Sequence, residues 1–121
     1  MQTVVETPSY LRAAKDAGLS EREMKDVVDA IATDPMQCDS IVGSGGCRKV
    51  RFAGRGKGKS GGYRVITFSS GPDIPAFLLT VFGKGEKSTL SDAEVNALAG
   101  ATRALAEAHR QQARKIRVIK Q

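Results

Sequence analysis

The spacing of apolar residues in the first third of the chain is typical of two helices. Thr7 followed by Pro8 predicts a helix start, because threonine caps helices well and proline is favoured at the first helical position. Gly18 predicts the end of that helix, and the capping box of Ser20 with Glu23 predicts the start of a second one. The second helix carries an apolar stripe at helical spacing, formed by Met24, Val27, Val28 and Ile31. We expect the two helices to form a hairpin with a structural role.

The pattern changes elsewhere to alternating or continuously apolar segments, which predict strands. The expected strands cover residues 2–5, 47–53, 63–68 and 75–82. Because only short connections join the last three, we expect them to form an antiparallel meander. Strand alternation places Val50 and Phe52 on the same face as Arg48, and it places Lys49 and Arg51 on the opposite face.

A second capping box, Ser91 with Glu94, predicts a C-terminal helix. The resulting order, β-α-α-β-β-β-α, predicts an α+β fold in which an N-terminal strand and the helical hairpin pack on a small antiparallel sheet. We expect the hairpin to cover one face of the sheet and the other face to be left carrying Lys and Arg side chains. Residues 1–109 are expected to form one domain, and residues 110–121 a basic C-terminal extension that either continues the helix or is disordered.

Composition excludes several classes of protein. The chain has 121 residues, of which 40% are hydrophobic, and no apolar run approaches the roughly 20 residues that a membrane helix needs. No secretion signal is visible at the N-terminus, which indicates a cytoplasmic protein. Cys38 and Cys47 do not have zinc-ligand spacing, and His109 is the single histidine, so no Cys/His metal cage and no paired-histidine acid–base site can form. We expect the two cysteines to be reduced thiols.

The positive charge is concentrated in two segments. Residues 40–72 contain seven Lys and Arg residues and no acid, and the residues after Glu107 contain five more, again without an acid. The rest of the chain holds the other 7 cations and all 13 acids, so it is net negative although the whole chain carries +6. This distribution favours a polyanionic partner over a merely solvated basic face. A membrane surface is disfavoured, because the basic loop has no apolar face to insert.

A glycine-rich basic loop, residues 53–62, lies between two expected strands. Its Gly58-Lys59-Ser60 is similar to the end of a Walker phosphate loop, but Ala53 stands where that motif needs glycine and a strand follows instead of a helix. We therefore exclude nucleotide hydrolysis. Lys57, Lys59 and Arg64 can instead surround one phosphodiester and stabilise the charge of a phosphoryl-transfer transition state. A plain nucleic-acid contact by the same loop is the alternative reading.

Three blocks of sequence resemble the RelE/ParE toxin superfamily, with the HigB-like branch the most similar. They are residues 45–51 (GGCRKVR), 56–66 (GKGKSGGYRVI) and 77–87 (FLLTVFGKGEK), and the resemblance spans residues 3–108. It implies the compact α+β fold of these toxins and the toxin role in a type II toxin–antitoxin system. It also implies cleavage of messenger RNA in the ribosomal A site by attack of the RNA 2′-hydroxyl, without a metal or other cofactor.

The resemblance also implies roles for individual residues. Arg64, in the Ser-Gly-Tyr-Arg pattern, matches the catalytic arginine, and Lys57 and Lys59 match the catalytic lysines of the loop. The expected RNA-binding residues are Lys49, Arg51, Arg55, Lys84 and Lys87. Some relatives use a tyrosine near the last helix as the base, whereas this chain has no tyrosine after Tyr63, so the proton acceptor stays open. The implied partners are a small DNA-binding antitoxin, the ribosome and messenger RNA.

Two other functions stay open at this stage. ParE-like relatives inhibit DNA gyrase by binding alone, although the lysine-rich loop argues against this reading, and a non-catalytic RNA-binding relative would have lost its chemistry. Arg64 has a purely structural alternative too, an ion pair with an acid of the last helix. Because Tyr63 and Arg64 are neighbours in a strand, Tyr63 is expected to face the core if Arg64 faces RNA.

Overall fold

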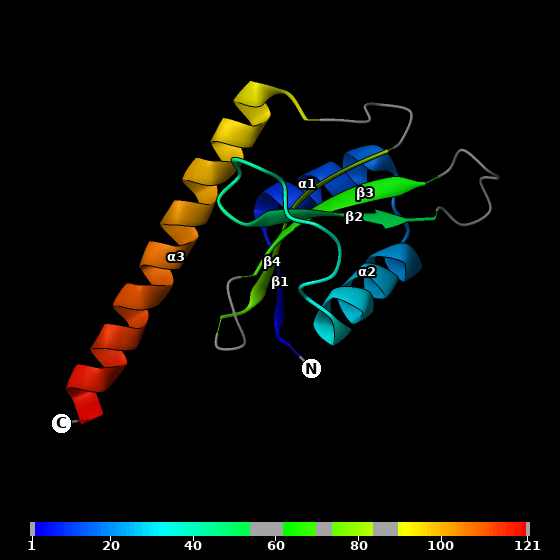
Figure 1. The fold of residues 1–121 in the computed structure, drawn as a ribbon. Helices are drawn as coiled ribbons and strands as arrows, with labels where there is room; N and C mark the ends of the chain where they lie inside the picture. Colours follow the sequence, from blue (N-terminus) through cyan, green and yellow to red (C-terminus); the bar gives the residue numbers. More distant parts are fainter. Residues whose placement is uncertain (1, 54–61, 70–73, 84–89, 121) are drawn as a thin grey trace.

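The computed structural model describes residues 2–53, 62–69, 74–83 and 90–120, with side chains up to residue 111 of the last helix. Its element order is the expected one (Figure 1). The elements are β1 (Val4–Glu6), α1 (Pro8–Ala17), α2 (Glu21–Thr33), β2 (Cys47–Phe52), β3 (Tyr63–Phe68), β4 (Ala76–Gly83) and α3 (Asp92–Lys120).

The helix ends confirm the sequence signals in atomic detail. The Thr7 hydroxyl accepts a hydrogen bond from the Tyr10 amide at 3.2 Å, and Pro8 occupies the first helical position. Gly18 ends α1 in the left-handed conformation with φ of 78°. The Ser20 side chain accepts from the Glu23 amide while the Glu23 carboxylate accepts from the Ser20 amide, which completes the capping box of α2.

The strands form one four-stranded sheet in the order β1-β4-β3-β2. The pairs β2–β3 and β3–β4 are antiparallel, which confirms the meander. The sheet as a whole is mixed, however, because β1 pairs with β4 in parallel, and the expectation of a purely antiparallel sheet was wrong in this respect. The α1–α2 hairpin carries the chain from one edge of the sheet to the other, and a crossover of this kind leaves the strands that it joins, β1 and β2, running in the same direction.

The hairpin packs on one face of the sheet and forms the larger core. Tyr10 of α1 and Ile31 of α2 are fully buried against Val65 and Leu78 of the strands. Tyr63 lies in the same core, where its ring stacks on Phe52 with centroids 5.6 Å apart. The expectation that Tyr63 faces the core is therefore confirmed.

The opposite face is covered over much of its area by α3, which corrects the expectation that it would be left to Lys and Arg side chains. Ile66, Phe68 and Phe82 point to this side and form a second core, against which Leu98 and Leu105 of α3 pack. Such large apolar side chains must be removed from water, and the apolar stripe of α3 supplies the cover. The part of this face that remains for cationic side chains is one end of it.

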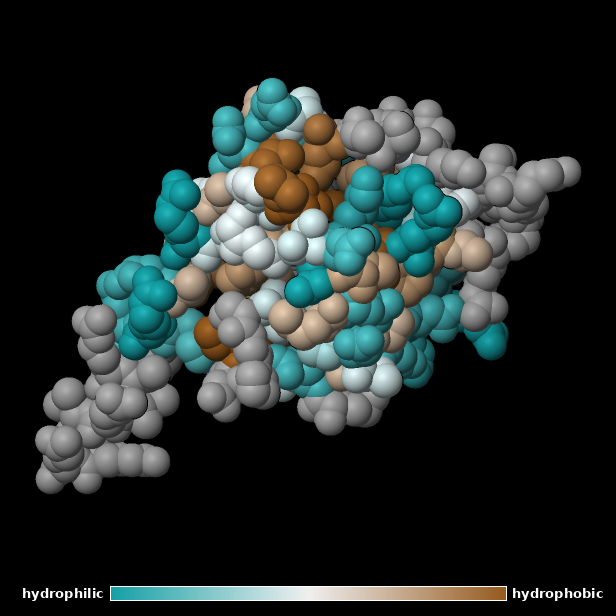
Figure 2. Space-filling view, viewed as in Figure 1, coloured by the Kyte–Doolittle hydropathy of each residue, from teal (hydrophilic) through white to brown (hydrophobic). Residues whose placement is uncertain are grey.

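The loop before β2 fastens α3 to the sheet. Gly43, Gly45 and Gly46 all have positive φ, and the Thr102 hydroxyl donates to the Ser44 carbonyl at 3.2 Å. A Cβ added at Gly45 would overlap the Thr102 hydroxyl oxygen, so the close approach of loop and helix requires glycine there. Figure 2 shows hydrophobic surface near the top of the view, where this loop meets α3, and Val42 of the loop is 94% exposed.

Helix α3 is much longer than the sheet that it covers. Its 29 residues correspond to about 43 Å, and its C-terminal turns extend well beyond the body of the domain (Figure 1). The basic C-terminal segment thus continues the helix, which was the first of the two expected alternatives. In the described part of the chain, neither this helix nor α1 or α2 combines the length and apolar character that a membrane crossing requires.

Candidate nucleic-acid interface

The candidate site lies at one end of the α3-side face, where β2 ends and β3 begins. Arg51 and Arg64 are direct partners in the antiparallel ladder, and Phe82 of β4 is the partner of Arg64 on its other side. Directly opposite residues project from the same face with Cβ atoms about 5 Å apart. The two arginines therefore form a cationic pair, flanked by the ring of Phe82.

The electrostatics of this pair are unfavourable in the protein alone. Arg64 is only 7% exposed, whereas Arg51 is exposed. Among the described residues, the Arg64 guanidinium makes no ion pair or hydrogen bond, so the structural alternative of an ion pair with an acid of α3 is absent there. Like charges directly opposite destabilise a sheet, and a largely buried charge without a partner is costly. A bound anion would remove both penalties.

Two acids of α3, Glu94 and Glu107, have other contacts. The carboxylate of Glu94 accepts from the Ser91 amide in the capping box that the sequence predicted, and Glu107 pairs with Arg110 one turn further along the helix. The carboxylates of Glu94 and Glu107 are therefore engaged at the start of α3 and near its middle.

Lys49 lies on the same face of β2 as Arg51, two residues earlier, and it is the ladder partner of Ile66. Arg48 projects to the other face, as alternation predicted, and donates a hydrogen bond to the Cys38 carbonyl. The remaining candidates lie outside the described residues, and they are Arg55, Lys57, Lys59, Lys84 and Lys87.

The described residues do fix where those segments join the sheet. Tyr63 is the ladder partner of both Phe52 and Gly83. The chain therefore leaves β2, enters β3 and leaves β4 at the same end of the sheet, which is the end that carries Arg51 and Arg64. The connections that contain the other candidates start from that end.

Cofactor-binding groups are sparse in the described structure. Within residues 2–53, 62–69, 74–83 and 90–120, no three Cys, His, Asp or Glu side chains gather in a way that could hold a metal ion. Both cysteines are free thiols, with Cys38 exposed and Cys47 buried in the second core. Burial raises the pKa of Cys47 to about 11, against a small opposing effect of its hydrogen bond with Ser44.

The fold and this site together define a class, a small α+β domain with a cationic pair at the end of an antiparallel meander. The chain belongs to the family described as the RelE toxin of the RelE/RelB toxin–antitoxin system, whose model matches residues 2–121. Membership identifies it as the toxin of such a pair and implies an antitoxin as its partner. The expected membership of the toxin superfamily is thus confirmed, and the HigB-like branch stays a prediction.

Among solved structures, the chain is similar to a double arginine-to-alanine mutant of the Escherichia coli toxin RelE in the free state. The TM-score is 0.55 at 17% sequence identity, and the match covers 84% of this chain and 96% of that one. At this identity the likeness supports the α+β fold and carries no information on individual side chains.

Proposed function

We propose that this toxin is a ribosome-dependent endoribonuclease that cuts messenger RNA without a metal ion. The observation that carries the proposal is the Arg51–Arg64 pair, in which a nearly buried guanidinium faces a second one across the ladder with no counter-ion among the described residues. A phosphodiester supplies the missing anion, and the planar fork of arginine matches its nonbridging oxygens.

The chemistry required of the site is a transesterification within the RNA. The 2′-oxygen bonds to the adjacent phosphorus as the bond from phosphorus to the 5′-oxygen breaks, which leaves a 2′,3′-cyclic phosphate and a 5′-hydroxyl. The proton of the 2′-hydroxyl passes to a base, and the departing 5′-oxygen gains a proton. Negative charge grows on the phosphoryl oxygens meanwhile, and a pre-positioned cation stabilises it, typically by a factor of about 10²–10³ in rate.

In this proposal Arg64 binds the scissile phosphate and stabilises the transition state, and Arg51 helps to hold the RNA. Lys57 and Lys59 are proposed to complete the catalytic set, and Lys49, Arg55, Lys84 and Lys87 to contact the RNA. Dependence on the ribosome follows if the protein alone lacks a complete acid–base pair, because orientation of the substrate can lower a barrier by roughly 7–11 kcal/mol. Such a toxin would act in the cytoplasm.

The test is cleavage of end-labelled messenger RNA in the presence of a chelator, with and without programmed ribosomes. Wild type is compared with Arg64→Ala and with Arg22→Ala, a matched control that removes an exposed arginine from α2 on the other side of the sheet. We expect cuts only with ribosomes, a loss of at least about a hundredfold for Arg64→Ala, and full activity for the control.

The outcomes separate the proposal from its alternatives. Cleavage that survives Arg64→Ala unchanged would remove Arg64 from the catalytic set. No cleavage in any lane, combined with inhibition of gyrase-dependent supercoiling, would favour a ParE-like inhibitor that acts by binding. No cleavage and no inhibition, combined with retained RNA binding, would favour a non-catalytic relative.

The proposed antitoxin is a small DNA-binding protein that neutralises the cationic surface. Co-expression with the adjacent reading frame and purification through a tag on the toxin should recover both chains in a stable complex. Recovery of free toxin at full yield from cells that grow normally would contradict this part of the proposal.

A further inference from the structure

A second cationic surface lies on α3, about four strand residues away from the Arg51–Arg64 pair. A groove of about 630 Å³ runs between this helix and the sheet, with Gly45 and Phe68 on one wall and Arg103 and Arg110 on the other. Phe68 is four residues beyond Arg64 in the same strand, so the groove and the cationic pair are separated by about 13 Å along β3. The two sites occupy opposite ends of one face.

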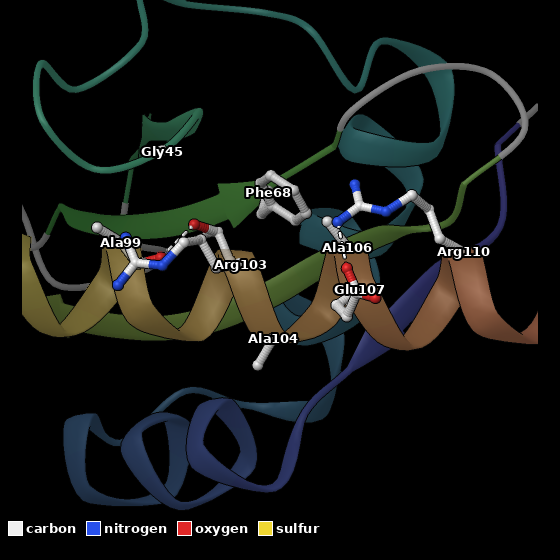
Figure 3. A pocket seen from close by; sticks show the side chains of 9 residues that line it. Gly45, Phe68, Ala99, Arg103, Ala104, Ala106, Glu107 and Arg110 are labelled. Carbon is white, nitrogen blue, oxygen red and sulfur yellow. Dashed lines mark hydrogen bonds and ion pairs between the residues drawn. The ribbon is translucent and has the colours of Figure 1, made fainter.

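The two arginines of the groove share a side of α3. They are seven residues apart, which is nearly two full turns, so their positions are separated by about 10 Å along the helix and about 20° around it. Figure 3 shows Arg103, Glu107 and Arg110 along one side of the helix beside the groove, with Glu107 joined to Arg110. The side chains of this pair are 59% and 49% exposed, and exposed pairs of this kind contribute little, so Arg110 can exchange its partner for a phosphate.

The sequence continues the same helical phase beyond the body of the domain. Positions 114 and 117 are both arginine, and they follow position 110 at spacings of four and seven residues. Positions 103, 110, 114 and 117 therefore form one row about 21 Å long on a helix whose last turns stand clear of the body (Figure 1). We call this row the arginine row of α3.

We propose that the arginine row of α3 is a second RNA-binding surface that takes the phosphate backbone of duplex RNA. The inference rests on the proposed function only in taking RNA, and not DNA, as the polyanion. A row of arginine positions along one side of a protruding helix matches a regular backbone, and duplex RNA is recognised mainly through its shape and its phosphates.

A single strand fits this surface less well. Single-stranded nucleic acid is held in grooves where bases stack on aromatic rings. Helix α3 contains no Phe, Tyr or Trp, and the ring of Phe68 in the groove wall is buried, with only 3% of the residue exposed. The arginine row thus offers a line of positive charge but no aromatic ring on which bases could stack. It would anchor the toxin on folded RNA while the Arg51–Arg64 pair holds the strand that is cut.

The test is binding of the full chain to fluorescent 16-nucleotide probes, followed by anisotropy across a range of salt concentrations. The probes are an RNA duplex, a single-stranded RNA and a DNA duplex of the same sequence. The variant is Arg103→Gln with Arg110→Gln. The matched control is Arg12→Gln with Arg22→Gln, which removes the same charge from exposed positions of α1 and α2.

We expect the α3 variant to bind the RNA duplex at least about tenfold more weakly at 0.1 M salt, and its salt slope to fall by about two, because two phosphate contacts are lost. The control should bind as wild type does, and Arg103→Lys with Arg110→Lys should restore most of the affinity. Circular dichroism of each variant confirms that α3 is retained.

Four outcomes would overturn the proposal. The first is an equal loss of affinity for the RNA duplex in the α3 variant and in the control. The second is that the α3 variant loses as much affinity for single-stranded RNA as for the RNA duplex. Each of these results indicates a general charge effect. The third is displacement of the RNA duplex by polyglutamate at matched charge, which indicates an acidic protein as the occupant. Tighter binding of the DNA duplex would overturn the choice of RNA. Because no probe needs to be cut, these results are independent of the cleavage assay, and failure of cleavage alone would leave the arginine row in place.

Discussion

The two faces of the sheet are built differently, and the difference separates stability from function. The face under α1 and α2 is closed by fully buried side chains such as Tyr10, Ile31 and Leu78. The face under α3 has a smaller core, and it also carries two grooves beside the helix and an arginine pair at one end. A single sheet can therefore keep an unfavourable charge arrangement on one side because the other side supplies most of the packing.

The largest expected effect is the difference in stability between substitutions at two adjacent leucines of β4. Leu78 is fully buried under the helical hairpin, whereas Leu79 faces α3 and borders a groove of about 450 Å³. Leu78→Ala should lower the free energy of unfolding by about 3–5 kcal/mol, and Leu79→Ala by roughly half as much, because a site beside open space can relax. Urea unfolding measures both. Equal losses would show that the two faces are packed equally well.

The next largest effect tests how the loop before β2 holds α3 against the sheet. Gly45→Ala should cost about 1–3 kcal/mol, because the new Cβ meets the Thr102 hydroxyl and the backbone has φ of +81°. Gly18→Ala is the matched control, since Gly18 has φ of +78° and no neighbour near an added Cβ. It should cost only the backbone strain, about 1 kcal/mol. Thermal unfolding of both proteins gives the comparison, and an equal cost would mean that loop and helix separate readily.

These glycines also show what the sequence could not predict. Caps and periodicity are local, so Thr7, Gly18 and the Ser20–Glu23 box placed the first two helices correctly. The close approach of Gly45 to Thr102 joins segments more than fifty residues apart, and nothing in the local pattern indicates it. The parallel pairing of β1 with β4 and the cover that α3 gives to the second face are tertiary outcomes of the same kind.

The candidate site shows the same division between what local patterns predict and what tertiary contacts decide. Alternation correctly put Tyr63 in the core and Arg51 on the face opposite Phe52. The pairing of Arg51 with Arg64 depends on the register of β2 and β3, which the long connection between these strands leaves undetermined in the sequence. The burial of Arg64 was likewise missed, because it depends on what packs around the strand end.

A smaller effect follows from the arginine pair. Arg64→Met keeps the length of the side chain and removes the charge, so it should raise the free energy of unfolding by up to about 1 kcal/mol at low salt. The gain should shrink at 1 M salt, because screening already weakens the repulsion. A double-mutant cycle with Arg51→Met isolates the coupling between the two positions. A loss of stability in Arg64→Met would indicate that its charge is balanced within the protein.

The effect that is smallest at neutral pH concerns the two thiols. At pH 8, Cys38 should react with a disulfide reagent at the rate of an exposed thiol, and Cys47 at least about a hundredfold more slowly, because its raised pKa and burial leave little accessible thiolate. The unfolded chain loses the Cys47 proton first as the pH rises. Stability should therefore fall between about pH 9 and pH 11. Cys47→Ser should remove the part of that decline that begins near pH 9, and equally fast reaction of both thiols at pH 8 would contradict the burial of Cys47.

The pairing of β1 with β4 also determines when during synthesis this molecule can take shape. Val4 aligns with Ala76 and Glu6 with Leu78, so the first strand cannot pair until about seventy more residues have been made. Arg51 gains its partner only when β3 has followed, and the second face is covered only by α3, which comes after all four strands in the sequence. Contacts this distant in sequence form late. The cationic pair therefore reaches its folded setting only after the ribosome has made the residues of α3.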